Sequence, residues 1–268
     1  MAKKLAAALR DVSGFAVLQS GKASTVKGML APDSALKNPH VSLLTIRQPW
    51  AQIMPTLKGA AVNLDFLNRQ AERMRKLDKG YKLLPMSGLD SRPAFLKGEP
   101  PWSPKITEAW AVLCEQIDSA LGADPAFRGL HVTAPTFDAS AEAHTNGSPS
   151  AGYTAAGWRD AWLEAFEGAA TALPASVSLI FSISVQPRAK QFVPAVCDAL
   201  RAKYGQRIIF QHNALHARCA SNPAHHKFVR EQHAKGSRIG FEQVCSAFHD
   251  PQRYGSSDPM GPLRLAIK

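Results

Sequence analysis

A glutamate, Glu242, interrupts the apolar segment SRIGFEQVCSAF at residues 237–248, which otherwise predicts a buried strand. A second carboxylate, Glu142, lies in the polar segment PTFDASAEAH at residues 135–144. Two carboxylates can cleave a glycosidic bond, because one protonates the leaving oxygen while the other attacks or stabilises the oxocarbenium-like carbon. These two glutamates are therefore the candidate catalytic residues, with Asp138 as the substitute for Glu142.

The elements that must position these residues are short apolar runs that alternate with helical patterns. In residues 63–80, for example, apolar residues recur every three or four positions until Gly80, which predicts a helix. Strands that alternate with helices pair in parallel through crossover connections, and continuous apolar strands indicate burial on both faces. The predicted strands are residues 14–21, 41–47, 81–88, 128–134, 177–184, 207–213 and 238–244.

An open doubly wound sheet and a closed (β/α)8 barrel both fit this α/β pattern. No glycine-rich dinucleotide fingerprint follows the first strand, and the GKAST at residues 21–25 lacks the glycine spacing of a phosphate loop. The pattern therefore favours a (β/α)8 TIM barrel.

We find no eighth strand in the sequence, because the chain after Glu242 ends in GPLRLAIK, which predicts the start of a helix. We therefore expect residues 1–268 to form a single (β/α) barrel domain that is incomplete at its C-terminus, through truncation of a longer protein. The alternative is that the N-terminal segment or another chain fills the gap.

Functional groups in such barrels lie at the C-terminal ends of the strands and in the loops that follow them. Polar side chains follow the second to seventh predicted strands at these positions. A sugar bound between the fourth and seventh strands would contact them. The predicted substrate-binding residues are Arg47, Trp50, Asp90, Asp138, His144, His212 and His216.

With these residues in place, the chain resembles clan A of the glycoside hydrolases, which are retaining (β/α)8-barrel enzymes. The segment at residues 41–88 is similar to the strand-two Trp, loop Pro and LD helix start with which many of those barrels begin their second and third repeats. The resemblance covers about residues 41–244. It implies hydrolysis of O-glycosidic bonds in an oligo- or polysaccharide.

The resemblance also implies roles for particular residues. Glu242 matches the nucleophile and Glu142 the acid/base, while Arg47 matches the basic residue that supports the nucleophile. His212 or His216 matches the strand-six residue that lines the site. The chain departs from the family where Ala141, and not Asn, precedes Glu142, and it has no counterpart of the strand-eight aromatic platform.

Other chemistries have less support. Glu242 could instead be a buried structural acid, paired with an arginine or with backbone donors, since an unpaired buried charge is costly. His212 and His216 are four residues apart, but they fall in a strand and a loop without nearby carboxylates, so we predict no metal and no cofactor. No G-x-S-x-G motif supports a serine nucleophile.

The composition limits the partners. The net charge of +11 suits an anionic partner such as nucleic acid, an acidic polysaccharide or a membrane surface. The basic residues are scattered, however, and their densest group, residues 69–82, has the spacing of a solvated helix face. Without a nucleic-acid-binding motif, a carbohydrate is the expected partner. A barrel that binds carbohydrate without cleaving it, or that has a structural role, is the alternative.

The cysteines and the first residues bear on location. The cysteines are far apart and show no zinc or redox spacing, which is typical of small core residues. The apolar run at residues 5–9 is too short for a signal peptide, and no segment approaches a membrane-spanning length. We therefore expect a cytoplasmic protein with no membrane contact.

Overall fold

Seven parallel strands form one sheet in chain order from β1 to β7, in a computed structural model of the chain. The structure describes residues 8–18, 31–57, 62–88, 91–137, 152–183, 189–212, 223–241 and 252, without the side chains of residues 223–226. The strands are β1 (Phe15–Leu18), β2 (Val41–Pro49), β3 (Gly80–Met86), β4 (Phe127–His131), β5 (Ser178–Ile183), β6 (Ile208–His212) and β7 (Arg238–Phe241).

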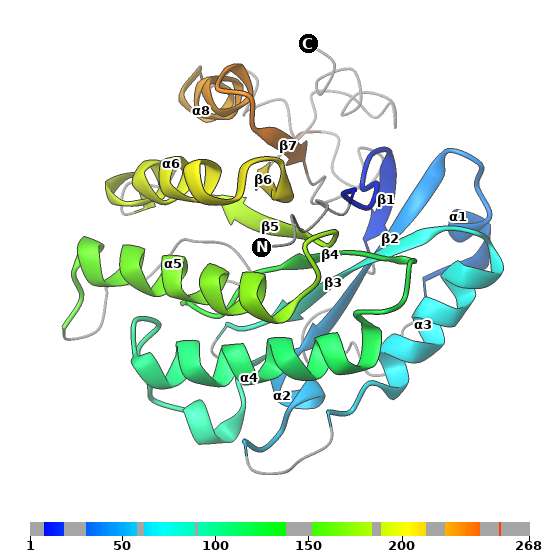
Figure 1. Ribbon diagram of the computed structural model, residues 1–268, viewed down its shortest axis with the longest axis horizontal. Helices are drawn as coiled ribbons and strands as arrows, with labels where there is room; N and C mark the ends of the chain where they lie inside the picture. Colours follow the sequence, from blue (N-terminus) through cyan, green and yellow to red (C-terminus); the bar gives the residue numbers. More distant parts are fainter. Residues whose placement is uncertain are drawn as a thin grey trace, which may run out of the picture.

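Helices connect successive strands, as parallel pairing requires. Figure 1 shows the four helices α4, α5, α6 and α8 stacked in chain order along one side of the sheet. The helices are α1 (Asp33–Leu36), α2 (Trp50–Ile53), α3 (Asp65–Lys76), α4 (Pro104–Leu121), α5 (Ala155–Ala172), α6 (Val193–Tyr204) and α8 (Pro223–Ala234), with short 3-10 turns η2 (Ala94–Leu96), η3 (Ala189–Gln191) and η4 (Gly205–Arg207).

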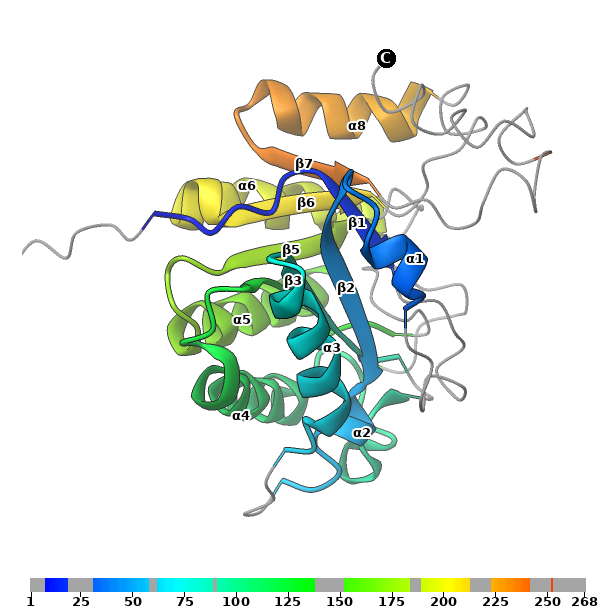
Figure 2. The ribbon, with the colours of Figure 1, turned by 90° about the vertical axis from the view of Figure 1, so that its right-hand side faces the viewer.

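The sheet curls so that β1 comes back towards β7 (Figures 1 and 2). Each strand pairs with the next one along the chain, and no pairing joins β1 to β7 in the described part of the chain. The fold is therefore an incomplete (β/α)8 barrel with seven described strands, as the sequence pattern predicts. No described helix is both long enough and apolar enough to cross a membrane.

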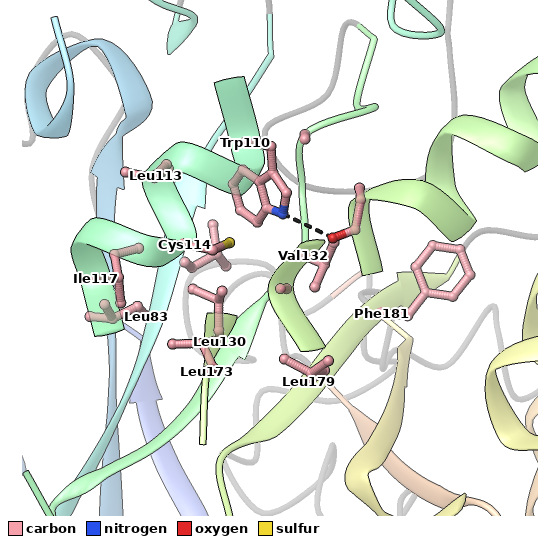
Figure 3. Close-up of a cluster of buried hydrophobic side chains, with 14 of the residues drawn as sticks. Leu83, Trp110, Leu113, Cys114, Ile117, Leu130, Val132, Leu173, Leu179 and Phe181 are labelled. Atoms are coloured by element: carbon pink, nitrogen blue, oxygen red, sulfur yellow. Dashed lines mark hydrogen bonds between the residues drawn. The ribbon is translucent and has the colours of Figure 1, made fainter. Parts of the chain in front are cut away.

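The helix-facing side of the sheet carries the main apolar core. Figure 3 shows Leu83, Leu130 and Leu179 from three successive strands together with Trp110 and Leu113 of α4. All of these side chains are buried, and burial of a large apolar side chain contributes about 1.5 to 3 kcal/mol. This packing fixes which face of each strand points outward and, by alternation, which residues point into the barrel.

The inner face carries polar and charged residues among the branched apolar ones that are usual in barrel interiors, such as Leu84 and Ile180. Leu130 packs against the helices, so the next residue, His131, lies on the opposite side of β4. The same alternation assigns Arg47 of β2, Lys82 of β3 and Ser182 of β5 to the inner face.

The segment before β1 runs along the amino ends of the strands and is held there by Arg10. Its backbone N–H donates to the carbonyl of Ser176 at 2.9 Å. Its guanidinium donates to three carbonyl oxygens that precede or begin β4, those of Gly122 (2.9 Å), Asp124 (2.6 Å) and Phe127 (2.8 Å). One side chain thus fastens the start of the described chain to its middle.

Candidate functional site

Arg47 lies near the C-terminal end of β2, because the ladder to β3 extends to the pair Pro49 and Met86. Its Nη2 atom donates to the Met86 sulfur at 3.6 Å. The Nε atom of Arg47 is buried and finds no hydrogen-bond partner among the described residues. The guanidinium therefore retains a donor that can bind a carboxylate or a substrate oxygen.

His131 is the last residue of β4, and the sequence analysis does not identify it. The side chain is 1% exposed, and neither ring nitrogen has a hydrogen-bond partner in the described structure. Burial holds the pKa of His131 well below its usual range, and the positive charges of Lys82 and Arg47 act in the same direction. The imidazole is therefore neutral at physiological pH, with one donor and one acceptor.

A hydroxyl pair joins the ends of β3 and β4. Thr133 donates to the carbonyl of Pro85 at 2.5 Å, and the hydroxyls of Ser87 and Thr133 lie 2.7 Å apart. Because the single hydroxyl proton of Thr133 goes to Pro85, Ser87 donates to Thr133. Both hydroxyl residues are fully buried, so the pair fixes two neighbouring loop starts.

The described residues after β4 contain no carboxylate. Residues 132–137 read VTAPTF, so an acid/base group after this strand would have to come from beyond Phe137. Arg92 holds this stretch in place, because its guanidinium donates to the carbonyls of Thr136 and Glu99, both at 2.8 Å. Burial lowers the pKa of Arg92 to about 10, although the charge of Glu99 acts in the opposite direction, so it stays a cation.

The structure does not bring the predicted substrate-binding residues together in one place. Arg47 lies on the inner face, whereas Trp50 begins α2, is fully buried, and packs edge-on against Trp110 with ring centroids 5.6 Å apart. This position favours a core role for Trp50 over a sugar platform. Six predicted site residues lie outside the described residues: Asp90, Asp138, Glu142, His144, His216 and Glu242.

β6 contributes two buried polar residues. His212 pairs with Ile183, whose side chain belongs to the helix-side core, so alternation assigns His212 to the outer side of β6. Gln211 pairs with Ser182 and has the parity of the inner face. The structure therefore brings Gln211, which the sequence analysis did not select, to the face that carries Arg47.

The seven described strands contain four fixed cations and no Asp or Glu. Hydrogen bonds from Ser13 lower the pKa of the Asp11 carboxyl, and the charges of Arg128 and Arg238 act in the same direction. Arg47 and Lys82 are the two cations that act on His131. On the inner face of the described strands, His131 thus lies close to two basic residues.

A cavity of about 1220 Å³ lies between β1 and β7, where the sheet is open. Phe15 and Ala16 line it from one edge, and residues 238–241 line it from the other. Lys82, Gln211 and Ile180, the cross-strand partner of His131, line it from the barrel interior. The cavity therefore reaches from the strand gap to the basic inner face.

The described residues contain no site for metal or thiol chemistry. No group of three or more His, Cys, Asp or Glu residues there could hold a metal ion. The thiols of Cys114 and Cys197 are free and fully buried, and burial raises the pKa of both. Neither is an activated nucleophile.

The strand order defines an incomplete (β/α)8 barrel. The chain is similar in structure to xylanase 10B from Thermotoga maritima, with a TM-score of 0.54 and 16% identity over 86% of this chain and 69% of that one. It is similar to the intracellular xylanase TsXylA of Thermoanaerobacterium saccharolyticum, with a TM-score of 0.53 and 12% identity over 86% and 72%.

A third similar structure is the GH10 xylanase of Thermobacillus composti, with a TM-score of 0.51 and 14% identity. The match covers 77% of this chain and 62% of that enzyme, so the chain spans less than two thirds of its length. At these identities the similarity establishes the fold alone. No protein-family model matches the chain, and no curated protein matches it in sequence.

Proposed function

We propose that the chain hydrolyses O-glycosidic bonds by a retaining two-carboxylate mechanism, with Glu242 as the nucleophile and Glu142 as the acid/base. One observation carries the proposal: Glu242 directly follows Phe241, the last residue of β7, in a barrel whose described strands supply only positive charge. Within β7, Gly240 pairs with the inward residue Gln211.

The basic inner face suits a nucleophilic carboxylate. A cation such as Arg47 nearby favours the ionised form of a carboxyl group, and its unpartnered Nε atom can donate to it. Glu142 has the opposite requirement, because an acid/base must hold its proton near neutral pH. The negative charge of Glu242, or partial desolvation, would raise the pKa of Glu142 as this role demands.

An oligo- or polysaccharide is the proposed partner. Similar structures include a xylanase complex with xylobiose and another with xylotriose. The fold that these enzymes share with this chain supports carbohydrate as the class of substrate. The loops that surround the site determine which sugar binds.

Substitution of the two glutamates tests the mechanism. Glu242→Gln and Glu142→Gln should each lower kcat/KM on a responsive glycoside by about 10²-fold or more, since each removes a group needed in the transition state. Glu164→Gln, on the exposed face of α5, is the matched control and should leave hydrolysis unchanged. NMR of the first-formed product should show retained anomeric configuration. Full hydrolysis by Glu242→Gln on every responsive glycoside would overturn the proposal.

A second function has a specific observation in its favour. Residues 132–137 supply no carboxylate at the end of β4, where an acid/base group is expected, which favours a barrel that binds carbohydrate without cleaving it or that has a structural role. Glycan binding without turnover, unaffected by Glu142→Gln, would select this alternative.

A further inference from the structure

The gap between β1 and β7 is bordered by two strand edges with which no described strand pairs (Figure 2). Strands β2 to β6 are mostly buried, whereas β7 is only partly buried along its length and β1 runs from exposed to partly buried. Phe15 of β1 is 51% exposed. Because an open strand edge presents backbone donors and acceptors, proteins usually pair or cover it.

The cavity in this gap suits a segment of polypeptide. Its volume of about 1220 Å³ exceeds the about 300 to 1,000 Å³ that is typical of small-molecule sites. Ile180 and Ile209, which pair across β5 and β6, give it an apolar inner wall. An extended segment with apolar side chains on one face could therefore fill it.

The two edges leave room for large side chains between them. Ala16 of β1 pairs with Leu43 and Gly240 of β7 pairs with Gln211, so the register assigns both small residues to the inner face. A Cβ atom added at Gly240 would meet no atom closer than 3.7 Å. Large residues on an intervening strand would interdigitate with these small ones, as in a packed barrel interior.

The described segment before β1 borders the gap without filling it. Arg10 fastens this segment along the amino ends of the strands, through the carbonyls of Gly122, Asp124 and Phe127. Val12 and Ser13 line the cavity, but residues 8–14 form no strand. A different segment is therefore needed to pair with both edges.

The sequence LRLAIK at residues 263–268, beyond the described part of the chain, has the period of a strand. Its apolar residues Leu263, Leu265 and Ile267 alternate with Arg264, Ala266 and Lys268. In a helix Leu265 would point away from Leu263 and Ile267, whereas in a strand all three share one face. Pro262 is compatible with a strand, because proline is tolerated at a strand's first residue.

The connection to this segment is long enough for parallel pairing. Residues 242–262 follow β7 and exceed the about a dozen residues that a crossover between parallel strands needs. Because the segment is tethered to β7, its pairing is intramolecular and is favoured by an effective concentration in the millimolar range. This favours the chain's own segment over a second copy.

We propose that residues 263–268 form the eighth strand, parallel to β7 and β1 and between them, with Leu263, Leu265 and Ile267 facing Ile180 and Ile209. Arg264 and Lys268 then lie on the outer side of the strand. The inference concerns closure of the barrel and does not depend on the proposed glycosidase function.

A pair of matched substitutions tests which face is buried. Leu265→Asp places a charge on the inner face, and Ala266→Asp places the same charge on the outer face. Hydrogen exchange in β1 and β7, measured by mass spectrometry on the full chain, should be about tenfold faster or more in Leu265→Asp and unchanged in Ala266→Asp. Equal exchange rates in the two variants would contradict the proposal.

Engineered disulfides test the position of the segment in the folded chain, and they do so even if Leu265→Asp fails to fold. Ala16→Cys is combined with Leu263→Cys, Leu265→Cys or Ile267→Cys, with Cys219→Ser and Cys245→Ser in every variant. At least one pair should form a disulfide within one chain, since this bond requires Cα atoms about 4.4 to 6.8 Å apart. Arg264→Cys with Ala16→Cys is the control and should link more slowly, because residue 264 points outward.

Three results would refute the proposal. The first is the absence of a disulfide from all three inward positions. The second is a link from Arg264→Cys as fast as the fastest inward pair. The third is a disulfide that joins two chains, seen as a dimer on a non-reducing gel, which would show that a second copy fills the gap.

Discussion

At the scale of the residue, His131 shows how a functional candidate can escape a sequence pattern. In the run RGLHVTA a histidine among apolar residues is indistinguishable from a satisfied core histidine. Its inward orientation appears only once Leu130 is seen against α4, because that contact fixes the parity of β4. Burial, with the basic neighbours on β2 and β3 acting in the same direction, lowers the pKa of the imidazole and keeps it neutral.

The hydroxyl pair between β3 and β4 supports a prediction at this scale. Thr133→Val keeps the side-chain shape but removes the short hydrogen bond to the Pro85 carbonyl and the 2.7 Å acceptor of the Ser87 hydroxyl, which keeps only a 3.5 Å contact with that carbonyl. The free energy of unfolding should fall by about 1 to 3 kcal/mol, measured by urea denaturation. Thr171→Val, at an exposed position of α5, is the control. Equal stability of Thr133→Val and the parent chain would show that this pair contributes nothing.

At the scale of the element, the strands and the longer helices were predictable, because burial on both faces leaves a largely apolar run in β2 to β6. The residues of the candidate site were harder to predict from the sequence. Trp50 follows a strand, where polar and aromatic groups often bind ligands, yet α2 turns it into contact with Trp110. Gln211 and His212 are adjacent, and only the strand register separates the inward residue from the outward one.

The predicted carboxylates illustrate a different limit. Glu242 is marked in the sequence by its apolar surroundings, and β7 ends one residue before it. Glu142 is marked only by its place after β4, and the described residues up to Phe137 do not reach it. A strand pattern predicts where a loop begins, whereas the path of the loop depends on contacts that one sequence does not reveal.

An acidic residue that joins β3, β4 and α3 supports a prediction about pH. Asp124 accepts hydrogen bonds from the Tyr81 hydroxyl (2.7 Å), Arg75 (2.6 Å) and the Ala126 N–H (2.9 Å). Burial raises the pKa of Asp124, but these bonds together lower it below its ordinary value. Its contribution to stability is therefore present above the unfolded pKa of about 3.9 and is lost as the pH falls through the folded pKa.

Asp124→Asn should lower the free energy of unfolding by about 1 to 3 kcal/mol at neutral pH. The difference from the parent chain should shrink below about pH 4, because the parent loses the same interactions on protonation. Denaturant titrations at several pH values measure both effects. Asp160→Asn, beside the exposed Arg159, is the matched control and should change little. A difference that is constant with pH would contradict the assigned cause.

At the scale of the whole molecule, Arg10 links the start of the described chain to the amino ends of β4 and β5. Arg10→Met removes its three guanidinium bonds and should lower the free energy of unfolding by about 1.5 to 3 kcal/mol. Hydrogen exchange should speed up in β1 as well as around Phe127, since both ends of the link are released. Arg159→Met is the surface control. Unchanged exchange in β1 would show that the pairing with β2 alone holds it.

The same link has a consequence for the order of events during synthesis. The carbonyls that Arg10 binds lie 112 to 117 residues further along the chain. At translation rates of about 5 to 20 residues per second, roughly 6 to 23 seconds pass between the synthesis of Arg10 and the synthesis of these partners. The guanidinium contacts of Arg10 can therefore form only when the start of β4 has emerged, later in synthesis than the pairing of β1 with β2.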